Sequence, residues 1–299
     1  MYSGLDEFVP RMSAFIRGAV AAEEPILVVV AAPKIDALRE ELGEDADAVL
    51  FADMADVGAN PARIIPAWRE FVDERLAPGG AVRGIGEPIS PDRGPAEMVE
   101  CHRHEALLNV AFADTPGFWL VCPYDTEALD PAVVEAARHT HPYLVAGGEA
   151  LASPVFDGVP AIAEPFSEPL PDPPGDAAEF EVHLDALGAV RRFVQRHAAR
   201  AQLSAERTLD LLVAVNEIAT NSVRHGGGRG RLLLWREPGA LICEVRDLGR
   251  IERPLVGRER PKHGQIGGYG VWLANQLCDL VQVRAFRSGG AVRLHMRLD

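Results

Sequence analysis

The chain has 299 residues, enough for two domains with sizeable cores, although a single domain is also compatible with this length. Hydrophobic residues make up 47% and charged residues 25%, which argues against wholesale disorder. The longest apolar run, Ile26 to Ala32, is too short to span a bilayer, and Asp6, Glu7 and Pro10 interrupt the first stretch. No membrane span or secretory signal is expected, so the composition predicts a cytoplasmic protein.

The net charge of −14 is unevenly distributed. From Ala177 onward there are 19 basic against 13 acidic residues, a net of +6, so the preceding part carries −20. This asymmetry predicts two domains with different partners. The arginines of the basic half are dispersed and are not interleaved with aromatic residues, so direct nucleic-acid binding is not expected. The four cysteines form no CxxC pair, which favours reduced thiols over disulfides or a structural zinc site.

The first half alternates between strand-like and helix-like segments, which predicts an α/β domain with a mostly parallel sheet. A β-branched run at Ile26 to Ala32 is typical of a strand that is buried on both faces. The other expected strands are Ala48 to Asp53, Ala81 to Ile85 and Trp119 to Cys122. The expected helices are Pro33 to Leu42, Pro61 to Leu76, Pro95 to Phe112 and Asp130 to His139.

A proline-dense stretch from Pro165 to Gly175 separates the two halves. Proline fixes φ and lacks a backbone donor, so this stretch predicts a semi-rigid linker. We therefore expect domains at residues 1–146 and 179–299, joined by a linker at 147–178.

The second half has a different pattern, with long amphipathic helices expected at Leu184 to Ala201 and Ser204 to Arg224 and a third at Val271 to Cys278. The expected strands are Arg231 to Glu237, Ala240 to Asp247, Val281 to Arg287 and Gly290 to Leu298. The order α-α-β-β-α-β-β predicts an α+β sandwich, with one helical layer on a mixed sheet.

Glu217 and Asn221 lie one turn apart on the second helix, among apolar neighbours. In a binding site, Asn221 would offer a carbonyl oxygen to Mg²⁺ and Glu217 would handle a proton. Surface exposure or a capping interaction is the alternative, because such a pair is common.

Two further motifs follow in the chain, and each is weak by itself. Asp247-Leu248-Gly249 ends a strand, where an aspartate can accept a hydrogen bond from an exocyclic amine, but it also resembles an ordinary turn. The glycines Gly267, Gly268 and Gly270 precede a helix, whose free N–H groups favour phosphate. No Gly-Lys-Ser/Thr follows, so this is not a P-loop.

In this order and spacing, the three motifs resemble the N, G1 and G2 boxes of the GHKL (histidine-kinase-like) ATPases. The nearest likeness is to anti-sigma-factor serine/threonine kinases, over Phe180 to Asp299. The resemblance implies that ATP and Mg²⁺ are the cofactors, that Asn221 ligates the metal and that Glu217 is the general base. It implies that Asp247 and Gly249 hold adenine, and that Gly267, Gly268 and Gly270 lie near the phosphates.

The resemblance also implies an ATP lid at residues 250–266. Four lid cations, Arg253, Arg258, Arg260 and Lys262, would neutralise phosphate, or would simply be solvated on a loop. His225 ends the first box and is expected to pack or to support the site rather than to accept phosphate.

The sequence of the first domain contains fewer candidate functional residues than that of the second. Its segment Glu100 to Glu105 contains Cys101, His102 and His104, and a metal site with Cys122 is one interpretation. Buried cysteine with ordinary polar contacts is the favoured alternative. Glu87 follows a strand, where ligands of parallel sheets usually lie, or it belongs only to a turn.

Residues 1–145 resemble the MEDS sensory domain in four segments, Asn60 to Trp68, Gly84 to Pro88, Arg103 to Asn109 and Cys122 to Asp125. That resemblance implies a sensor of small, hydrocarbon-like molecules. It also implies a fold similar to the RecA/KaiC core, without a phosphate loop.

Together the resemblances predict a bacterial signalling regulator, in which a ligand-sensing domain controls an anti-sigma-factor-type serine/threonine kinase. The expected protein partners are an anti-anti-sigma (STAS) protein, a sigma factor or both. A homodimer is a further alternative for the assembly of the chain. The alternative is a non-catalytic module that binds nucleotide or protein without phosphotransfer.

Overall fold

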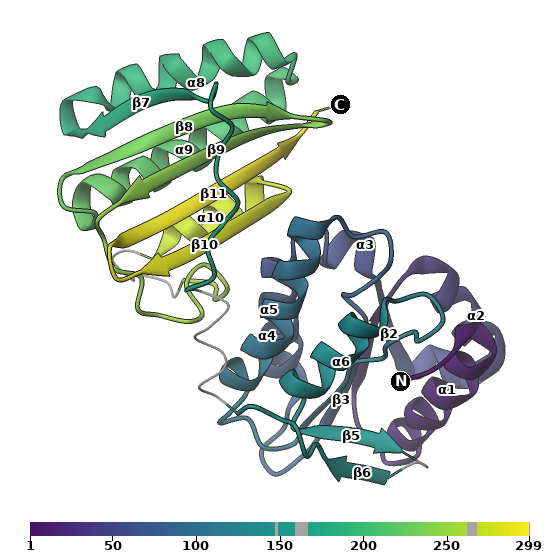
Figure 1. Ribbon diagram of the computed structural model, residues 1–299. Helices are drawn as coiled ribbons and strands as arrows, with labels where there is room; N and C mark the ends of the chain where they lie inside the picture. The colour runs from purple at the N-terminus through teal and green to yellow at the C-terminus, as the bar shows by residue number, and fades with distance from the viewer. Residues whose placement is uncertain (147–148, 159–166, 262–267, 299) are drawn as a thin grey trace. The chain divides into compact units, whose positions relative to one another are not determined.

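The computed structural model describes residues 1–146, 149–158, 167–261 and 268–298, which form two compact units, Met1–Ala161 and Ile162–Asp299. Figure 1 shows the elements of both units in chain order. Within the described ranges, no helix is long and apolar enough to cross a membrane.

The first unit is built on a four-stranded sheet of order β2-β1-β3-β4, in which every neighbouring pair is parallel. Its strands are β1 (Ile26–Val30), β2 (Val49–Asp53), β3 (Val82–Gly86) and β4 (Phe118–Val121). Its helices are α1 (Gly4–Ala21), α2 (Ala32–Leu42), α3 (Met54–Val57), α4 (Ile64–Arg75), α5 (Pro95–Ala111) and α6 (Pro131–Thr140). Short 3₁₀ turns at Gly43–Ala48 and Pro61–Arg63 precede β2 and α4.

Two separate cores cover the two faces of this sheet. Ile26, Val28 and Val30 of β1 pack with α1 and α2, whereas Val29 packs with α4 on the other face. Because side chains alternate along a strand, a run of β-branched residues supplies both cores at once. The parallel α/β sheet expected from the alternating pattern is confirmed, while likeness to the RecA/KaiC core stays a prediction.

Four elements of this unit, namely α1, α3, β5 and β6, were not expected from the sequence. Helix α1 contains Pro10, which lacks the backbone N–H that would donate to the carbonyl of Asp6, and the helix nevertheless forms and buries Phe8 and Ile16. The hairpin of β5 (Tyr143–Ala146) and β6 (Glu149–Ala152) extends into the range expected to be linker.

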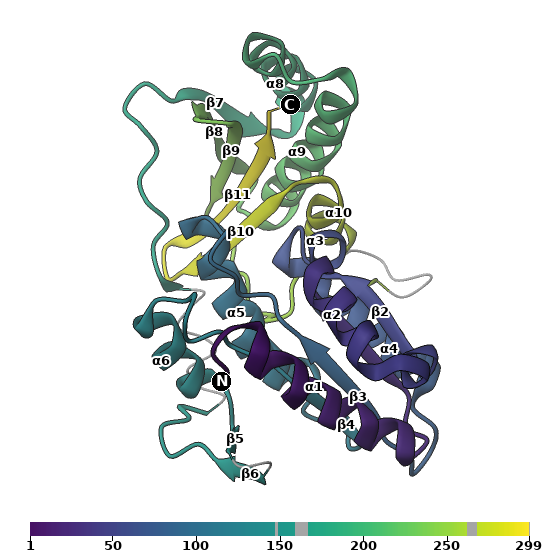
Figure 2. The same ribbon diagram turned by 90° about the vertical axis from the view of Figure 1, so that its right-hand side faces the viewer.

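The second unit is a five-stranded sheet of order β10-β11-β9-β8-β7 with three helices packed on one face (Figures 1 and 2). The strands are β7 (Ala178–His183), β8 (Arg229–Glu237), β9 (Ala240–Asp247), β10 (Leu280–Phe286) and β11 (Gly289–Arg297). The helices are α8 (Leu187–Ala201), α9 (Ala205–His225) and α10 (Tyr269–Leu277), and a 3₁₀ turn at Leu184–Ala186 precedes α8.

This sheet corrects two expectations. All four strand pairs are antiparallel, so the mixed sheet predicted from the sequence is wrong. The element order also begins with β7, which the sequence pattern did not suggest. Only Val182 of this edge strand is fully buried, and its exposed glutamates Glu179 and Glu181 make the segment look like loop.

The described part of the proline-rich stretch lies against the sheet face opposite the helices (Figure 1). Arg284 Nε donates to the carbonyl of Glu168 at 2.9 Å, and an Arg293 guanidinium nitrogen donates to that of Pro171 at 2.6 Å. Proline cannot donate from its backbone, so the contacts to this stretch use arginine donors and linker carbonyls. Arg293 Nε is also held at 2.6 Å by the fully buried carboxylate of Glu244.

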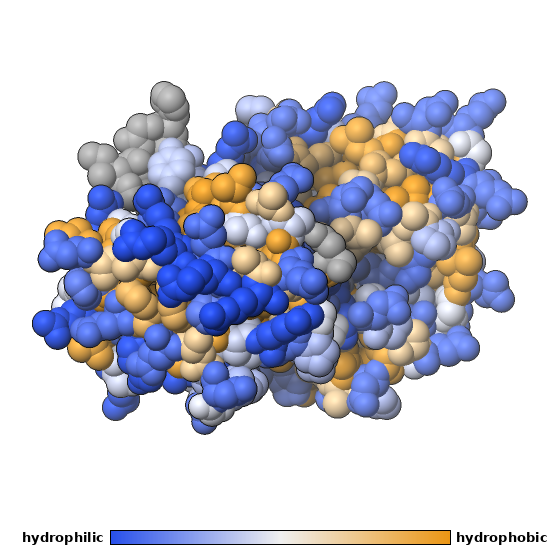
Figure 3. Space-filling model, turned by 90° about the horizontal axis from the view of Figure 1, so that it is seen from above, coloured by the Kyte–Doolittle hydropathy of each residue, from blue (hydrophilic) through white to orange (hydrophobic). Residues whose placement is uncertain are grey.

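Helix α8 shows why the basic residues of this half are dispersed. It buries Val190, Phe193 and Val194 and exposes its arginines to solvent. These arginines are Arg191, Arg192, Arg196 and Arg200. The view of the surface from above shows strongly hydrophilic residues in a band among hydrophobic ones (Figure 3). The arginines of α8 therefore lie on the solvent-exposed face of this helix.

Two glycines of β3 make room for the Trp68 ring, which is 1% exposed. A Cβ on Gly84 would lie 2.8 Å from Trp68 Cζ3 and 2.9 Å from a methyl carbon of Leu120. A side chain at this position would therefore overpack the core between β3 and α4.

We expect Gly84→Ala to lower the free energy of unfolding of the first unit by about 1–3 kcal/mol. Chemical denaturation followed by circular dichroism measures this loss. Gly175→Ala is the matched control, since a Cβ there meets nothing within 4 Å. Equal stability of the two variants would show that the Trp68 ring does not need the space.

Candidate functional site

The last turns of α9 carry Glu217 and Asn221, both half-buried and four residues apart. The helix is fixed by Leu211, Val215 and Ile218, which pack into the core on the sheet. Among the described residues, neither the Glu217 carboxylate nor the Asn221 carboxamide has a hydrogen bond or ion pair. Both groups are therefore available to a ligand, and the capping alternative is not observed.

Asn221 lies directly against the start of α10. A Cβ on Gly270 would lie only 2.5 Å from Asn221 Nδ2, so a side chain there would collide with the carboxamide. Gly268 is the N-cap of α10 and has φ of +88°, a left-handed conformation that glycine adopts readily. The first and third motifs thus meet, with the free N–H groups of a helix N-terminus beside Asn221.

Asp247, at the end of β9, lies against the other side of the α9 terminus. A Cβ on Gly226, the residue that ends α9, would lie 2.4 Å from Asp247 Cγ. Asp247 Oδ1 accepts a hydrogen bond from the backbone N–H of Gly249 at 2.7 Å. The second carboxylate oxygen has no hydrogen-bond partner among the described residues, so it can accept from an amine.

Gly249, like Asp247, lies in close contact with the end of α9. A Cβ on Gly249 would lie 2.8 Å from the carbonyl oxygen of His225, so the turn after β9 rests on the end of α9. His225 contributes its backbone carbonyl to this contact, and its side chain is exposed, so its expected supporting role stays a prediction. The structure therefore brings together Glu217, Asn221, Asp247, Gly249, Gly268 and Gly270, whereas Gly267 lies outside the described residues.

The described part of the expected lid, residues 250–261, is hydrogen-bonded to α10 through Gly257. Its carbonyl accepts from Asn275 Nδ2 of α10 at 2.9 Å, and Asn275 is 2% exposed. Arg253 pairs with Glu259 at 3.3 Å, and Arg258 is buried. Lys262 lies outside the described residues. Within residues 250–261, Arg260 is an exposed cation with no ion pair to a described residue.

Two supporting residues were missed in the sequence, Gly226 and Asn275. Gly226 opens the glycine run 226–228 directly after the second helix, and such a run is a signal for close backbone approach. Asn275 is a polar residue on an otherwise apolar short helix, which indicates that its side chain has a buried partner.

In the first unit, Glu87 is a buried acid rather than a turn residue. Its carboxylate accepts from the hydroxyl of Tyr2 and pairs with Lys34 Nζ at 2.6 Å. Burial raises the pKa of Glu87 above its ordinary value, although Lys34 opposes the shift. Burial and the neighbouring Glu87 raise the pKa of Tyr2. The three side chains satisfy one another at the carboxyl end of the sheet.

All four cysteines are free thiols, as expected. Cys101 is fully buried and its Sγ donates to the Pro88 carbonyl at 3.4 Å, so the favoured alternative of ordinary contacts holds for this residue. Glu105 and Cys122 do lie close together, but their third neighbour is His141, which the sequence did not single out.

Two family models match the chain. Residues 1–142 match the MEDS sensory domain (methanogen/methylotroph, DcmR sensory domain), and residues 180–297 match the histidine kinase-like ATPase domain. No curated protein matches the sequence.

Among solved structures, one match is the crystal structure of the RsbU and RsbW domains of Rv1364c from Mycobacterium tuberculosis. It is 18% identical with a TM-score of 0.32, and the match covers 43% of this chain and 33% of that chain. This chain thus spans about a third of that protein, and the likeness is too distant to carry an argument. The two family models, by contrast, identify this chain as a MEDS sensory region followed by a histidine kinase-like ATPase region.

Proposed function

We propose that the second unit binds ATP with Mg²⁺ and transfers phosphate to a serine or threonine of a partner protein. One observation carries this proposal: Asn221, Asp247 and the start of α10 all lie at the end of α9. The match to the histidine kinase-like ATPase domain supports the nucleotide. We also propose that the first unit senses a small ligand and controls this activity.

The unpaired groups of the site suit the parts of this nucleotide. The free oxygen of Asp247 would accept from the adenine amine, with Gly249 beside the base. The carboxamide oxygen of Asn221 would ligate Mg²⁺, and the N–H groups at the start of α10, at Gly268 and Gly270, would hold phosphate oxygens. Bound Mg²⁺ supplies charge neutralisation of the triphosphate.

Glu217, one helical turn from Asn221, is the proposed general base. It would take the proton of the attacking hydroxyl while the new oxygen–phosphorus bond forms and ADP leaves. The proposed protein substrate is a STAS-type anti-anti-sigma protein, and a sigma factor is the proposed second partner. The match to a sensory domain favours regulation over metabolism as the purpose of the chain.

Asn221→Ala is expected to weaken Mg²⁺-dependent binding of ATP by about tenfold or more, or about 1.4 kcal/mol, because it removes one metal ligand. Isothermal titration of the full chain with ATP, with and without Mg²⁺, measures this change. Asn216→Ala is the matched control, because Asn216 lies on the same helix and its carboxamide oxygen accepts from Arg191 Nε at 2.9 Å. Equal weakening in both variants would contradict the proposed metal ligand.

Gly270→Ala is expected to weaken binding to a similar degree, although it removes neither the Asn221 carboxamide nor the Gly270 N–H group. The added Cβ would displace the Asn221 carboxamide, which lies 2.5 Å away. Its control is Gly188→Ala in α8, where the nearest atom is 3.8 Å from the added Cβ. Unchanged affinity with an unchanged melting temperature would show that Asn221 need not be held by this contact.

Glu217→Gln is expected to lower phosphotransfer by roughly 10²–10⁴-fold while ATP still binds. The assay follows labelled phosphate from ATP to a purified STAS protein of the same organism. Glu206→Gln, at the exposed start of the same helix, is the control. If the unsubstituted chain binds ATP but transfers nothing to the STAS protein, the second unit is a binding module and the kinase assignment is wrong.

A further inference from the structure

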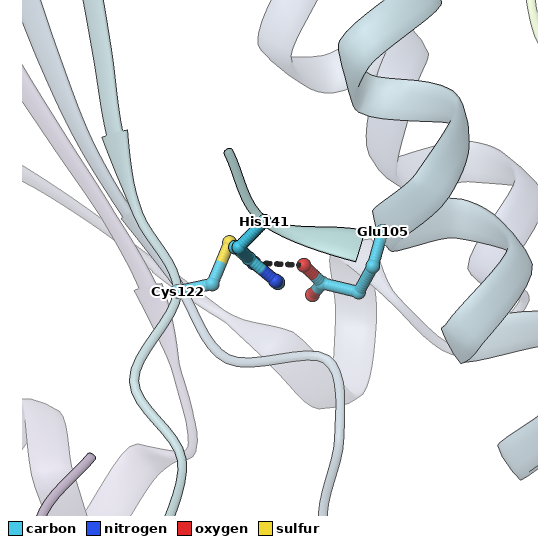
Figure 4. A group of neighbouring side chains, drawn as sticks. All are labelled: Glu105, Cys122 and His141. Carbon is cyan, nitrogen blue, oxygen red and sulfur yellow. Dashed lines mark ion pairs between the residues drawn. The ribbon is translucent and has the colours of Figure 1, made fainter. Parts of the chain in front are cut away.

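Three side chains with metal-binding atoms converge in the first unit (Figure 4). Glu105 lies on α5, Cys122 directly follows β4, and His141 directly follows α6. One ligand atom from each residue lies within 4.8 Å of the other two. The residues come from three separate elements, and Cys122 lies beyond the carboxyl end of its parallel strand, where ligands of such sheets bind.

The His141 ring is fixed with one nitrogen facing this cluster. Nδ1 lies 2.7 Å from the carbonyl oxygen of Ala137, which can only accept, so Nδ1 carries the hydrogen. Nε2 lies 2.9 Å from Glu105 Oε2. In the neutral ring its lone pair therefore faces the cluster, as in metal-binding histidines whose other nitrogen donates to a backbone carbonyl.

The backbone around His141 is braced as well. Asn109 Nδ2 of α5 donates to the carbonyl of Thr140 at 2.8 Å, which ties the end of α6 to the helix that carries Glu105. The Tyr124 ring packs edge-on against the His141 ring, with centroids 5.6 Å apart. Three ligand atoms are thus positioned by packing and hydrogen bonds that do not involve a metal.

The polar groups at the centre of the cluster are incompletely satisfied. Glu105 is 2% exposed, and the hydrogen-bonding partners of its carboxylate among the described residues are the His141 ring and the Cys122 thiol, the other two members of the cluster. The buried Tyr124 hydroxyl has no hydrogen-bond partner in this part of the chain. Because a buried carboxylate with so few partners is costly, a cation between the three residues would offset that cost.

A thiolate sulfur, an imidazole nitrogen and a carboxylate oxygen form a donor set typical of Zn²⁺. Tetrahedral zinc holds such atoms about 3.3–3.6 Å apart, so modest movement of the side chains would close the site. The His141 side chain is 20% exposed, which leaves one side open to solvent.

We propose that Glu105, Cys122 and His141 bind one divalent transition-metal ion of the Zn²⁺ class. Three protein ligands leave the fourth position open for water or for a small molecule with a donor atom. On binding, the Cys122 thiol and the Nε2–H of His141, which faces Glu105, give up their protons to solvent, and sulfur–metal and nitrogen–metal bonds form with no change of oxidation state. The site is independent of the proposed kinase activity, since no residue of the second unit contributes to it.

Calorimetric titration of the chelator-treated full chain with Zn²⁺ tests the proposal. We expect one equivalent to bind, and Co²⁺ to give a thiolate-to-metal absorption band. Cys122→Ser and Glu105→Gln should each weaken binding by about tenfold or more, and Cys122→Ser should remove the band. Cys101→Ser and His139→Ala are the controls, because these residues lie nearby but outside the cluster, and both should bind as the unsubstituted chain does.

A second measurement does not depend on any substitution folding correctly. Zn²⁺ should slow alkylation of Cys122 in the unsubstituted chain, followed by mass spectrometry of the peptide that contains it. An unchanged alkylation rate, or equal Zn²⁺ affinity in Cys122→Ser and Cys101→Ser, would overturn the proposal. The cluster would then be a buried ion pair with a neighbouring thiol and nothing more.

Discussion

The contact between the end of α9 and three positions without side chains determines the arrangement of the candidate nucleotide site. Gly226 lets Asp247 approach the helix terminus, Gly249 lets the turn after β9 rest on it, and Gly270 admits the Asn221 carboxamide. A Cβ at any of these positions would come within 3.0 Å of a neighbouring atom. Motifs that are far apart in the sequence thus come into contact because these three glycines have no side chain that would hold them apart.

The two units use buried polar groups in different ways. In the first, Tyr2, Lys34 and Glu87 satisfy one another, whereas the buried Glu105 is paired with His141 and with the weak donor of the Cys122 thiol. In the second, the sheet face opposite the helices pairs charges and also binds the linker carbonyls. A buried carboxylate with few partners is therefore a stronger indication of a ligand than one inside a complete network.

Much of this architecture could be predicted from periodicity, because β1 and α9 bury nearly continuous or regularly spaced apolar residues. Edge strand β7 was missed since only one of its residues is fully buried, and strand direction in the second sheet cannot be read from residue pattern. The close approach of Asn221, Asp247 and the glycines at the end of α9 could be predicted because the order of these motifs along the chain is distinctive, and their binding of nucleotide stays a prediction. His141 could not, because it reaches Glu105 and Cys122 only through the tertiary fold.

The central claim is that the groups at the end of α9 receive Mg²⁺ and ATP. A crystal structure of the full chain with Mg²⁺ and a non-hydrolysable ATP analogue tests it most directly. The account predicts the adenine amine at Asp247, the metal at the Asn221 oxygen and the phosphates at the start of α10. Nucleotide bound elsewhere, or a metal without Asn221 among its ligands, would contradict it.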